Sequence, residues 1–337
     1  MATNRGGMEG FSPKRMALGL FSSLGLSFIV IYILLHRYRL EQDLGDILAS
    51  LPAPFILAAL LLLLIGWVAD ALRIRELAGI FGIPLPLRLA FPAVLAGNFA
   101  INITPFYMGA GLVHIYVFRE KGLDLPRSTA AVAGGALVSH ASQAILALVS
   151  LVLTWEAVAL SLTASRALVI GLSTYLAFIV ALGIVAGLVE DPSRLLGGLL
   201  RYPQARWAGD RLRDFHRGLA LLLKAGPRRL GRMFLFSLVY LVSFYSITPV
   251  LLAGMGFSQP LGQVIAFQLV LFFAASLAPT PGSAGAIELG AFSLFSFIVP
   301  LDILGNFLVW WRLLTFYLNV LVGTGPFIYL AIGRTWS

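Results

Sequence analysis

The residues from Met16 to Leu35 form a run of twenty without a single charged side chain. At about 1.5 Å per residue, a helix of this length crosses the roughly 30 Å hydrocarbon core of a bilayer. Several later runs are equally apolar, and the whole chain is 59% hydrophobic but only 12% charged. A soluble domain carries about 25% charged residues because its surface faces water. The sequence therefore predicts an all-α polytopic membrane protein.

The first apolar run follows a basic flank that contains Arg5, Lys14 and Arg15. A secretory signal has an apolar core of about 7–15 residues and a small-residue cleavage site. This run is longer, and no such site precedes His36, so we expect an uncleaved first span. The sequence contains no Cys, which excludes disulfides, thiol catalysis and cysteine-ligated metal sites.

We expect six full transmembrane helices and two further apolar regions that Pro and Gly interrupt. The full spans cover about 16–35, 54–72, 128–154, 167–189, 233–253 and 303–332, and the broken regions cover about 88–118 and 261–299. Segment 190–232 carries ten basic residues and four acids, whereas loop 254–260 carries no charge. Because cytoplasmic loops are enriched in Lys and Arg, we expect both termini and segment 190–232 in the cytoplasm. The expected location is the inner (plasma) membrane.

This charge pattern fits six spans only if each broken region enters and leaves the membrane on one side. Region 88–118 then opens from the cytoplasm and region 261–299 from the outside, as two re-entrant hairpins in an inverted arrangement. The expected organisation is a first membrane half, a cytoplasmic segment and a second membrane half, over residues 1–189, 190–232 and 233–337.

The basic segment also indicates the kind of partner. A net charge of +9 is compatible with nucleic acid, but the charges cluster beside apolar spans, so we expect anionic phospholipid headgroups and no nucleic acid. Residues 205–224 place apolar side chains on one stripe and Arg on the opposite face. They are expected to form an interfacial amphipathic helix; a connector docked on the spans is the alternative.

The two broken regions share a pattern, because in each a Thr-Pro pair is followed by Gly four residues after the Pro: Thr104, Pro105 and Gly109, then Thr280, Pro281 and Gly285. Pro removes a backbone donor and Gly lowers helix propensity, so each helix should stop there. Broken backbone cannot face lipid, because an unsatisfied amide costs several kcal/mol. Paired interruptions of this kind are typical of the central site of a transporter. The alternative is two Pro kinks in full-length helices.

Ionisable residues at membrane depth are few and include His114, His140, Glu288 and Arg312. Burying such groups is expensive, so each needs a partner or a polar cavity. In the functional interpretation Arg312 holds a substrate phosphate while Glu288 contacts a cation or a proton. In the other interpretation the two charges neutralise each other and fix packing. The remaining candidate substrate-binding residues are Asn98, Asn102, Gln143, Gly282, Ser283 and Tyr317.

Four blocks resemble the transmembrane region of lysylphosphatidylglycerol synthases, which is the flippase half of MprF proteins. They are Trp67 with Leu72-Arg73-Ile74-Arg75, Gly97 through Pro105 with Gly109, Pro279 through Glu288, and Trp311 through Tyr317. The resemblance covers nearly the whole chain. It implies a free-standing family member that translocates lipid, with Glu288 and Arg312 as cavity residues.

The chain departs from the family pattern at four positions. Gly111 and His114 stand where the family commonly has an acid and Arg, and His140 and Gln143 stand where it has Arg and Asp. The missing fixed charges argue against lysyl-phosphatidylglycerol as the lipid. No aminoacyltransferase domain follows in this sequence, so we expect translocation without lipid synthesis.

These features predict flippase-like translocation of a phospholipid or other lipid-linked anionic amphiphile between leaflets, and not an enzyme. The sequence has no Gly-x4-Gly-Lys-Ser/Thr or His-Glu-x2-His motif, and we expect no catalytic residue, metal or cofactor. One alternative is an intramembrane enzyme in which Glu288 and a His act as acid and base on a lipid-linked substrate. Another is a non-catalytic accessory subunit of envelope glycolipid synthesis. A homo-oligomer and an envelope-biosynthesis partner are both left open, because small-residue runs suit either kind of helix contact.

Overall fold

The computed structural model describes residues 13–38, 44–158, 170–171, 173–175, 177, 216, 220–222 and 224–332. Within these ranges every regular element is a helix, and five helical stretches are long and apolar enough to cross a membrane. The all-α membrane architecture is therefore confirmed. The predicted span 167–189 and the predicted interfacial helix 205–224 fall almost wholly outside the described residues.

The five long stretches correspond to five of the six predicted spans. They are α1 (Pro13–Arg37), α3 (Ala53–Ile80), α6 (Leu125–Val158), α9 (Pro227–Gly254) and a composite of α12 and α13 over Leu301–Ala331. Several run further than predicted, and α3 continues past Leu72 because its charged last turns find partners. Arg73 lies 2.6 Å from Asp70, and Glu76 lies 3.0 Å from Arg232 of α9. Hydropathy marks where a helix leaves the apolar layer, not where it ends.

The last predicted span has a local change of winding. The chain forms α12 (Leu301–Arg312), a π-helical turn η4 (Leu313–Tyr317) and α13 (Leu318–Ala331) without interruption. Such π-turns inside α-helices are frequent at functional sites. The turn begins directly after Arg312.

Both Pro/Gly breaks reverse the chain. In the first, α4 (Leu87–Ile103) is followed by the short helix η1 (Pro105–Tyr107) and by α5 (Gly109–Glu120). The two helices pack side by side so closely that a Cβ on Gly109 would lie 2.1 Å from the carbonyl oxygen of Ala100. Only glycine fits at that position. The alternative of a kinked full-length helix is therefore wrong for this region.

The second break has the same construction. Here α10 (Leu261–Ser276) leads through η3 (Pro281–Ser283) into α11 (Ala286–Phe295). A Cβ on Gly290 of α11 would lie 2.7 Å from the Leu271 side chain of α10, so these helices also fold back on each other.

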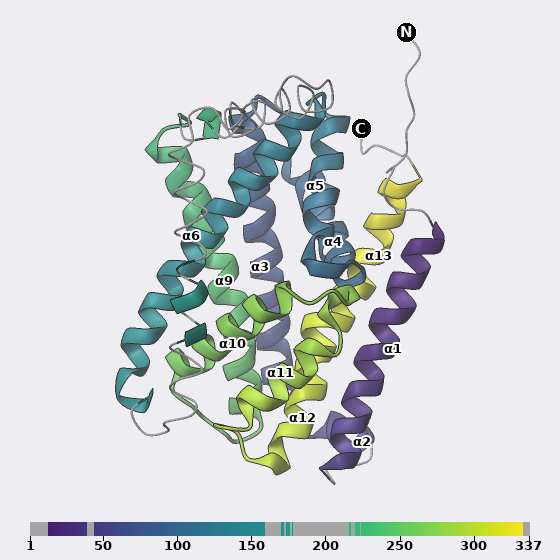
Figure 1. The fold of residues 1–337 in the computed structure, drawn as a ribbon, viewed down its shortest axis with the longest axis vertical. Coiled ribbons are helices and arrows are strands. Elements are labelled where there is room, and N and C mark those ends of the chain that lie inside the picture. The colour runs from purple at the N-terminus through teal and green to yellow at the C-terminus, as the bar shows by residue number, and fades with distance from the viewer. Residues whose placement is uncertain are drawn as a thin grey trace, which may run out of the picture.

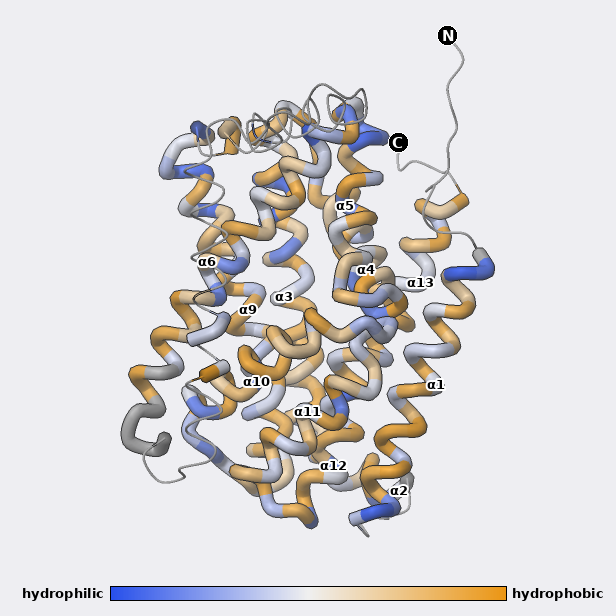
Figure 2. The backbone as a smooth tube through the Cα atoms, viewed as in Figure 1, coloured by the Kyte–Doolittle hydropathy of each residue, from blue (hydrophilic) through white to orange (hydrophobic). Residues whose placement is uncertain are grey.

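The two hairpins occupy opposite halves of the bundle. Figure 1 shows α4 and α5 in the upper half, α10 and α11 in the lower half, and both turns near mid-height. Helix α1 begins and α13 ends in the upper half, below the ends of α3 and α5, while the short helix α2 (Leu44–Ala49) lies at the lower end. Apolar residues cover most of the height, and hydrophilic residues gather toward the upper end (Figure 2).

Candidate functional site

The turns of the two hairpins meet and hydrogen-bond to each other. The backbone N–H of Phe106 donates to the carbonyl of Ala278 at 3.2 Å, and the N–H of Gly282 donates to the carbonyl of Thr104 at 3.1 Å. Backbone amides without a hydrogen-bond partner are costly inside a membrane. Each break therefore supplies a hydrogen-bond acceptor for a backbone N–H of the other break. The junction is therefore a single unit built from segments about half the chain apart.

The two turns also share a backbone conformation. After Pro105, Phe106 and Tyr107 have φ values of 56° and 53°, and after Pro281, Gly282 and Ser283 have φ values of 60° and 50°. A non-glycine residue in this left-handed region costs roughly 1–2 kcal/mol. The packing of the junction has to offset that cost at three positions. The two breaks therefore have nearly the same backbone conformation.

Several predicted site residues serve the backbone of these turns. Thr104 donates its hydroxyl to the carbonyl of Ala100 at 2.8 Å, and Thr280 donates to the carbonyl of Ala284 at 2.9 Å. Ser283 donates to the carbonyl of Ala275 at 2.5 Å.

The second turn requires glycine at position 282 for a steric reason. Gly282 has a positive φ, and a Cβ there would lie 2.4 Å from the carbonyl oxygen of Asn102. The first turn has a phenylalanine, Phe106, at the equivalent position, but the second turn has no room for any side chain at Gly282.

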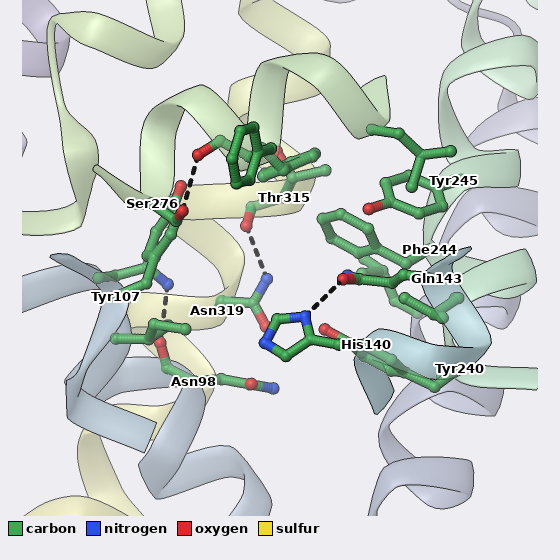
Figure 3. A pocket seen from close by; sticks show the side chains of 18 of the residues that line it. Asn98, Tyr107, His140, Gln143, Tyr240, Phe244, Tyr245, Ser276, Thr315 and Asn319 are labelled. Atoms are coloured by element: carbon green, nitrogen blue, oxygen red, sulfur yellow. Dashed lines mark hydrogen bonds between the residues drawn. The ribbon is translucent and has the colours of Figure 1, made fainter. Parts of the chain in front are cut away.

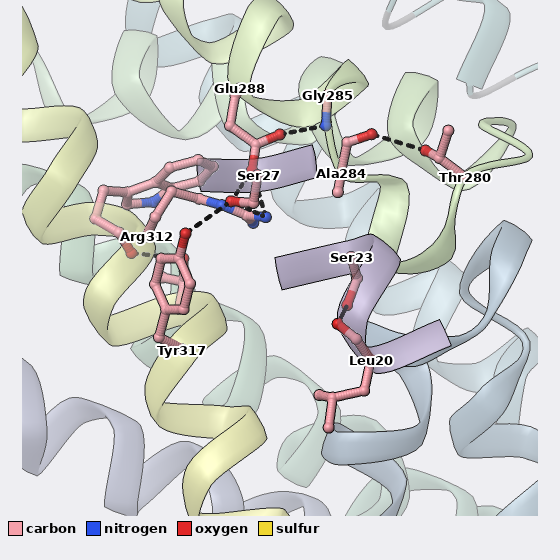
Figure 4. A network of polar contacts seen from close by, with 11 residues as sticks. Leu20, Ser23, Ser27, Thr280, Ala284, Gly285, Glu288, Arg312 and Tyr317 are labelled. Carbon is pink, nitrogen blue, oxygen red and sulfur yellow. Dashed lines mark hydrogen bonds and ion pairs between the residues drawn. The ribbon is translucent and has the colours of Figure 1, made fainter. Parts of the chain in front are cut away.

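A buried ion pair lies beside the junction (Figure 4). A terminal nitrogen of Arg312 lies 2.6 Å from Oε1 of Glu288, and the two side chains are 3% and 1% exposed. The other carboxylate oxygen accepts the backbone N–H of Gly285 at 2.6 Å, which caps the N-terminus of α11. The guanidinium also lies 4.0 Å from the ring centre of Phe316, within the range of a cation–π interaction. The two charges are thus paired in this arrangement, as in the second of the two interpretations of the sequence, and the role of Arg312 as a substrate contact stays a prediction.

Helix α1 completes the network through a residue that sequence analysis does not single out. The hydroxyl of Ser27 donates to Oε1 of Glu288 at 2.5 Å, and Tyr317 donates to the oxygen of Ser27 at 3.2 Å. Nearby, Gly19 of α1 approaches α4 so closely that a Cβ would lie 2.3 Å from the carbonyl oxygen of Ile103. Helix α1 therefore covers the junction and holds the acidic partner of Arg312.

A cavity of about 540 Å³ lies between the hairpins and the long helices. Five of the predicted substrate-binding residues line it: Asn98, Asn102, His140, Gln143 and Arg312. Figure 3 shows Asn98 and His140 pointing into the same space from different helices. The other eleven, which are Thr104, Pro105, Gly109, His114, Thr280, Pro281, Gly282, Ser283, Gly285, Glu288 and Tyr317, lie outside its described lining.

His114 is one of the residues outside the lining. It is buried between α4 and α5, where its Nε2 lies 3.4 Å from the place of a Cβ on Gly97. Nε2 has no hydrogen-bond partner among the described residues. The role of His114 as a substrate contact stays a prediction.

The structure adds polar and aromatic lining residues that sequence analysis does not propose as substrate-binding residues. They include Trp67, Tyr107, Tyr240, Tyr245, Thr315 and Asn319. Trp67 donates to Oδ1 of Asn319 at 3.1 Å across 252 sequence positions. On the α6 side, Oε1 of Gln143 accepts the hydroxyl of Tyr175 and lies 3.1 Å from Nδ1 of His140. The walls are therefore built from fixed neutral polar groups and rings.

The cavity has an apolar rim at the junction. Phe106 and Leu277 both line it, and yet they are 46% and 62% exposed. The exposed surface of these two side chains marks an open and apolar part of the cavity wall.

Comparison with known proteins identifies the family. The family model described as the lysylphosphatidylglycerol synthase TM region matches residues 16–323. The chain belongs to this family. It is also 20% identical over 313 residues to a UPF0104 membrane protein of Archaeoglobus fulgidus, with 91% of this chain and 94% of that relative covered. The family, the relative and the five long apolar helices agree on a multi-pass membrane protein.

Proposed function

We propose that this family member moves a phospholipid or another lipid-linked anionic amphiphile between the leaflets, with the polar head passing through the central cavity. The observation that carries the proposal is a buried cation, Arg312, on the wall of a cavity whose rim at Phe106 and Leu277 is apolar and exposed. A charged head that crosses hydrocarbon unaided loses its hydration. A polar cavity replaces that hydration while the tails stay in lipid.

The ion pair suggests how a phosphate is accommodated. Leaving Arg312 buried without an anion is strongly unfavourable, and Glu288 supplies that anion in the structure; we propose that an entering phosphate binds the same guanidinium alongside the carboxylate. The guanidinium is then paired at every stage. Its Nε has no hydrogen-bond partner among the described residues, so part of its donor capacity is unused in the arrangement described.

The proposed orientation places the end of the bundle that carries α5 and the start of α9 in the cytoplasm. The helix ends on that side of the bundle (Figure 1) are the end of α3, the start of α4, the end of α5 and the start of α9, and they carry basic residues, among them Arg75, Arg88, Arg119, Lys121, Arg228 and Arg229. The end of α1, the helix α2 and the start of α12 lie on the opposite side (Figure 1), and they carry Arg37, Asp46 and Asp302. In line with the positive-inside rule, we propose that both termini lie in the cytoplasm, and we propose the cell inner membrane as the location.

Two observations favour translocation over the alternative of an intramembrane enzyme. No carboxylate stands among the described lining residues of the cavity, and Glu288 is held by three neighbours, Arg312, Ser27 and Gly285. A general acid or base has to reach its substrate within hydrogen-bond distance. Glu288 is instead committed to the ion pair and the helix cap.

The test uses purified protein in liposomes with tail-labelled fluorescent phosphatidylglycerol in both leaflets. An impermeant reductant then quenches the outer leaflet. Wild-type protein is expected to expose nearly all of the label, whereas protein-free liposomes lose only the outer-leaflet signal. A wild-type preparation that behaves like protein-free liposomes would overturn the proposal.

The informative variant is the double substitution Glu288→Gln with Arg312→Gln. Removing both partners of a buried pair leaves no unpaired charge, so the fold is expected to survive. The rate of translocation is expected to fall by about tenfold or more, which corresponds to the loss of one stabilising contact of ~1.4 kcal/mol. A folded double variant that moves the lipid at the wild-type rate would show that Arg312 does not contact the head.

A further inference from the structure

The central cavity is electrically neutral in the described arrangement. Arg312 is the one charged side chain among its described lining residues, and Glu288 neutralises it from 2.6 Å. A phosphate therefore finds a cationic partner at one place only among the described lining residues, the guanidinium of Arg312. The rest of the cavity offers an entering head no fixed charge.

The remaining wall offers hydrogen-bond donors and acceptors together. Asn98 has an amide and Tyr240 a hydroxyl, and neither side chain hydrogen-bonds to any described residue. Asn102 donates through Nδ2 to the carbonyl of Asn98 at 2.7 Å, which leaves its amide oxygen to accept. An anion accepts only, whereas a hydroxyl both donates and accepts. The mixture therefore matches hydroxyl groups better than additional phosphate oxygens.

Aromatic rings surround these polar groups. Trp67, Tyr240, Phe244, Tyr245 and Phe272 all line the cavity, and Figure 3 shows Tyr240, Phe244 and Tyr245 along one wall. Rings of this kind bury the apolar face of a ligand while polar atoms at their edges hydrogen-bond. A cyclic polyol has both surfaces, because its C–H bonds and its hydroxyls point in different directions.

A cationic head fits the same walls less well. Aromatic faces attract cations, but a buried cation also needs an anionic partner. The described lining supplies Arg312 and no carboxylate. An ammonium group in this cavity would therefore find no anionic partner on the described walls.

We infer that the head carried through this cavity bears a neutral polyhydroxyl ring, a sugar or a cyclitol, beyond its phosphate. The ring lies against Tyr240 and the amide of Asn98, and the phosphate lies at Arg312. This inference rests on the proposed function, and it adds the chemical class of the head.

The test compares tail-labelled lipids that share tails and a single negative charge but differ in hydroxyls. Phosphatidylethanol has none on its head, phosphatidylglycerol carries an open-chain diol, and phosphatidylinositol carries a cyclitol. Wild-type protein is expected to move phosphatidylinositol about tenfold faster than phosphatidylethanol, as expected for two added hydrogen bonds. A glucosyl diacylglycerol and phosphatidylcholine test a sugar without phosphate and a cationic head. Equal rates for all lipids, or phosphatidylcholine moving fastest, would overturn the inference.

Variants assign the preference to the wall. Tyr240→Phe removes only a hydroxyl, and Asn98→Ala removes only the amide, so each is expected to cut the preference for phosphatidylinositol by about fivefold. The readout is the ratio of the phosphatidylinositol rate to the phosphatidylethanol rate for each variant, so a general loss of transport that lowers both rates equally does not count as a loss of preference. Tyr32→Phe, on the 59% exposed Tyr32 of α1, is the matched control and should leave the preference intact.

A binding measurement separates this inference from the proposed function. In detergent, phosphatidylinositol should raise the unfolding temperature more than phosphatidylethanol does, because a ligand of the folded state stabilises it. Tyr240→Phe should remove that difference. If no lipid is translocated but this selective stabilisation persists, the transport proposal fails and the head-group inference stands. If neither lipid stabilises the protein selectively, the inference fails whatever the transport result.

Discussion

The hydroxyl of Ser27 lies 2.5 Å from a carboxylate oxygen of Glu288, although 261 sequence positions separate the two residues. The contact joins α1 to the start of α11, at the junction of the two broken helices. It also fixes the carboxylate that neutralises Arg312. The first span of the chain therefore contributes to the candidate site itself.

Replacing Ser27 by Ala should loosen this attachment. The substitution removes one charge-assisted hydrogen bond from Glu288, so we expect the free energy of unfolding to fall by about 1.5–3 kcal/mol. Ser22→Ala is the control, since the Ser22 hydroxyl bonds only carbonyls of its own helix. Its expected change is within about 0.5 kcal/mol. Thermal unfolding in detergent compares the two, and equal losses would contradict a special role for Ser27.

The ion pair predicts opposite outcomes for single and double substitutions. Arg312→Gln alone leaves the Glu288 carboxylate buried and unpaired, which should destabilise the fold by about 3–5 kcal/mol. Adding Glu288→Gln removes that unpaired charge and should recover most of the loss. Chemical or thermal unfolding of wild type, of the Arg312→Gln and Glu288→Gln single variants and of the double variant measures the coupling. Purely additive losses would mean that the two charges do not depend on each other.

Close packing at the first turn gives a steric test. A Cβ on Gly109 would lie 2.1 Å from the carbonyl oxygen of Ala100, whereas a Cβ on Gly111 would first meet Val132 at an ordinary 3.5 Å. Gly109→Ala should therefore separate α5 from α4 and lower both the unfolding temperature and the transport rate. Gly111→Ala, two positions along the same helix, should behave like wild type. A stable and active Gly109→Ala variant would argue against the reversed hairpin.

The inverted orientation of the hairpins can be measured directly because the chain contains no Cys. Asp124 lies between α5 and α6, and Ser258 lies between α9 and α10, and both are exposed. In intact cells, an impermeant maleimide should modify the Ser258→Cys variant. It should reach the Asp124→Cys variant only after lysis. Labelling of both variants from the same side would contradict the arrangement.

The breaks are the part of the fold that the sequence predicts best, because Pro and Gly act on their own backbone. A Pro at 105 or 281 removes a donor whatever lies nearby, and the close approach at Gly109 is a local property of the turn. The pairing of Glu288 with Arg312 was also predictable, since two opposite charges at membrane depth need compensation.

Contacts between distant spans could not be predicted in this way. A Ser in an apolar run carries no signal of its own, so Ser27 reads as an ordinary residue of the first span. The Trp67–Asn319 hydrogen bond depends on how α3 and α13 are placed, which hydropathy does not encode. The same holds for the π-helical turn at Leu313–Tyr317, because its residues continue the apolar run around it.

A reversible chemical plug tests the central claim most directly. The Asn98→Cys variant places a thiol on the cavity wall, and Phe28→Cys places one on the 66% exposed, outward face of α1. Both are reconstituted with labelled lipid, modified with a neutral benzyl methanethiosulfonate, and checked for complete modification by mass spectrometry. We predict that modification stops translocation by the Asn98→Cys variant, that a reducing agent restores it, and that the Phe28→Cys variant is unaffected. Undiminished translocation by fully modified Asn98→Cys protein would contradict the passage of the lipid head through this cavity.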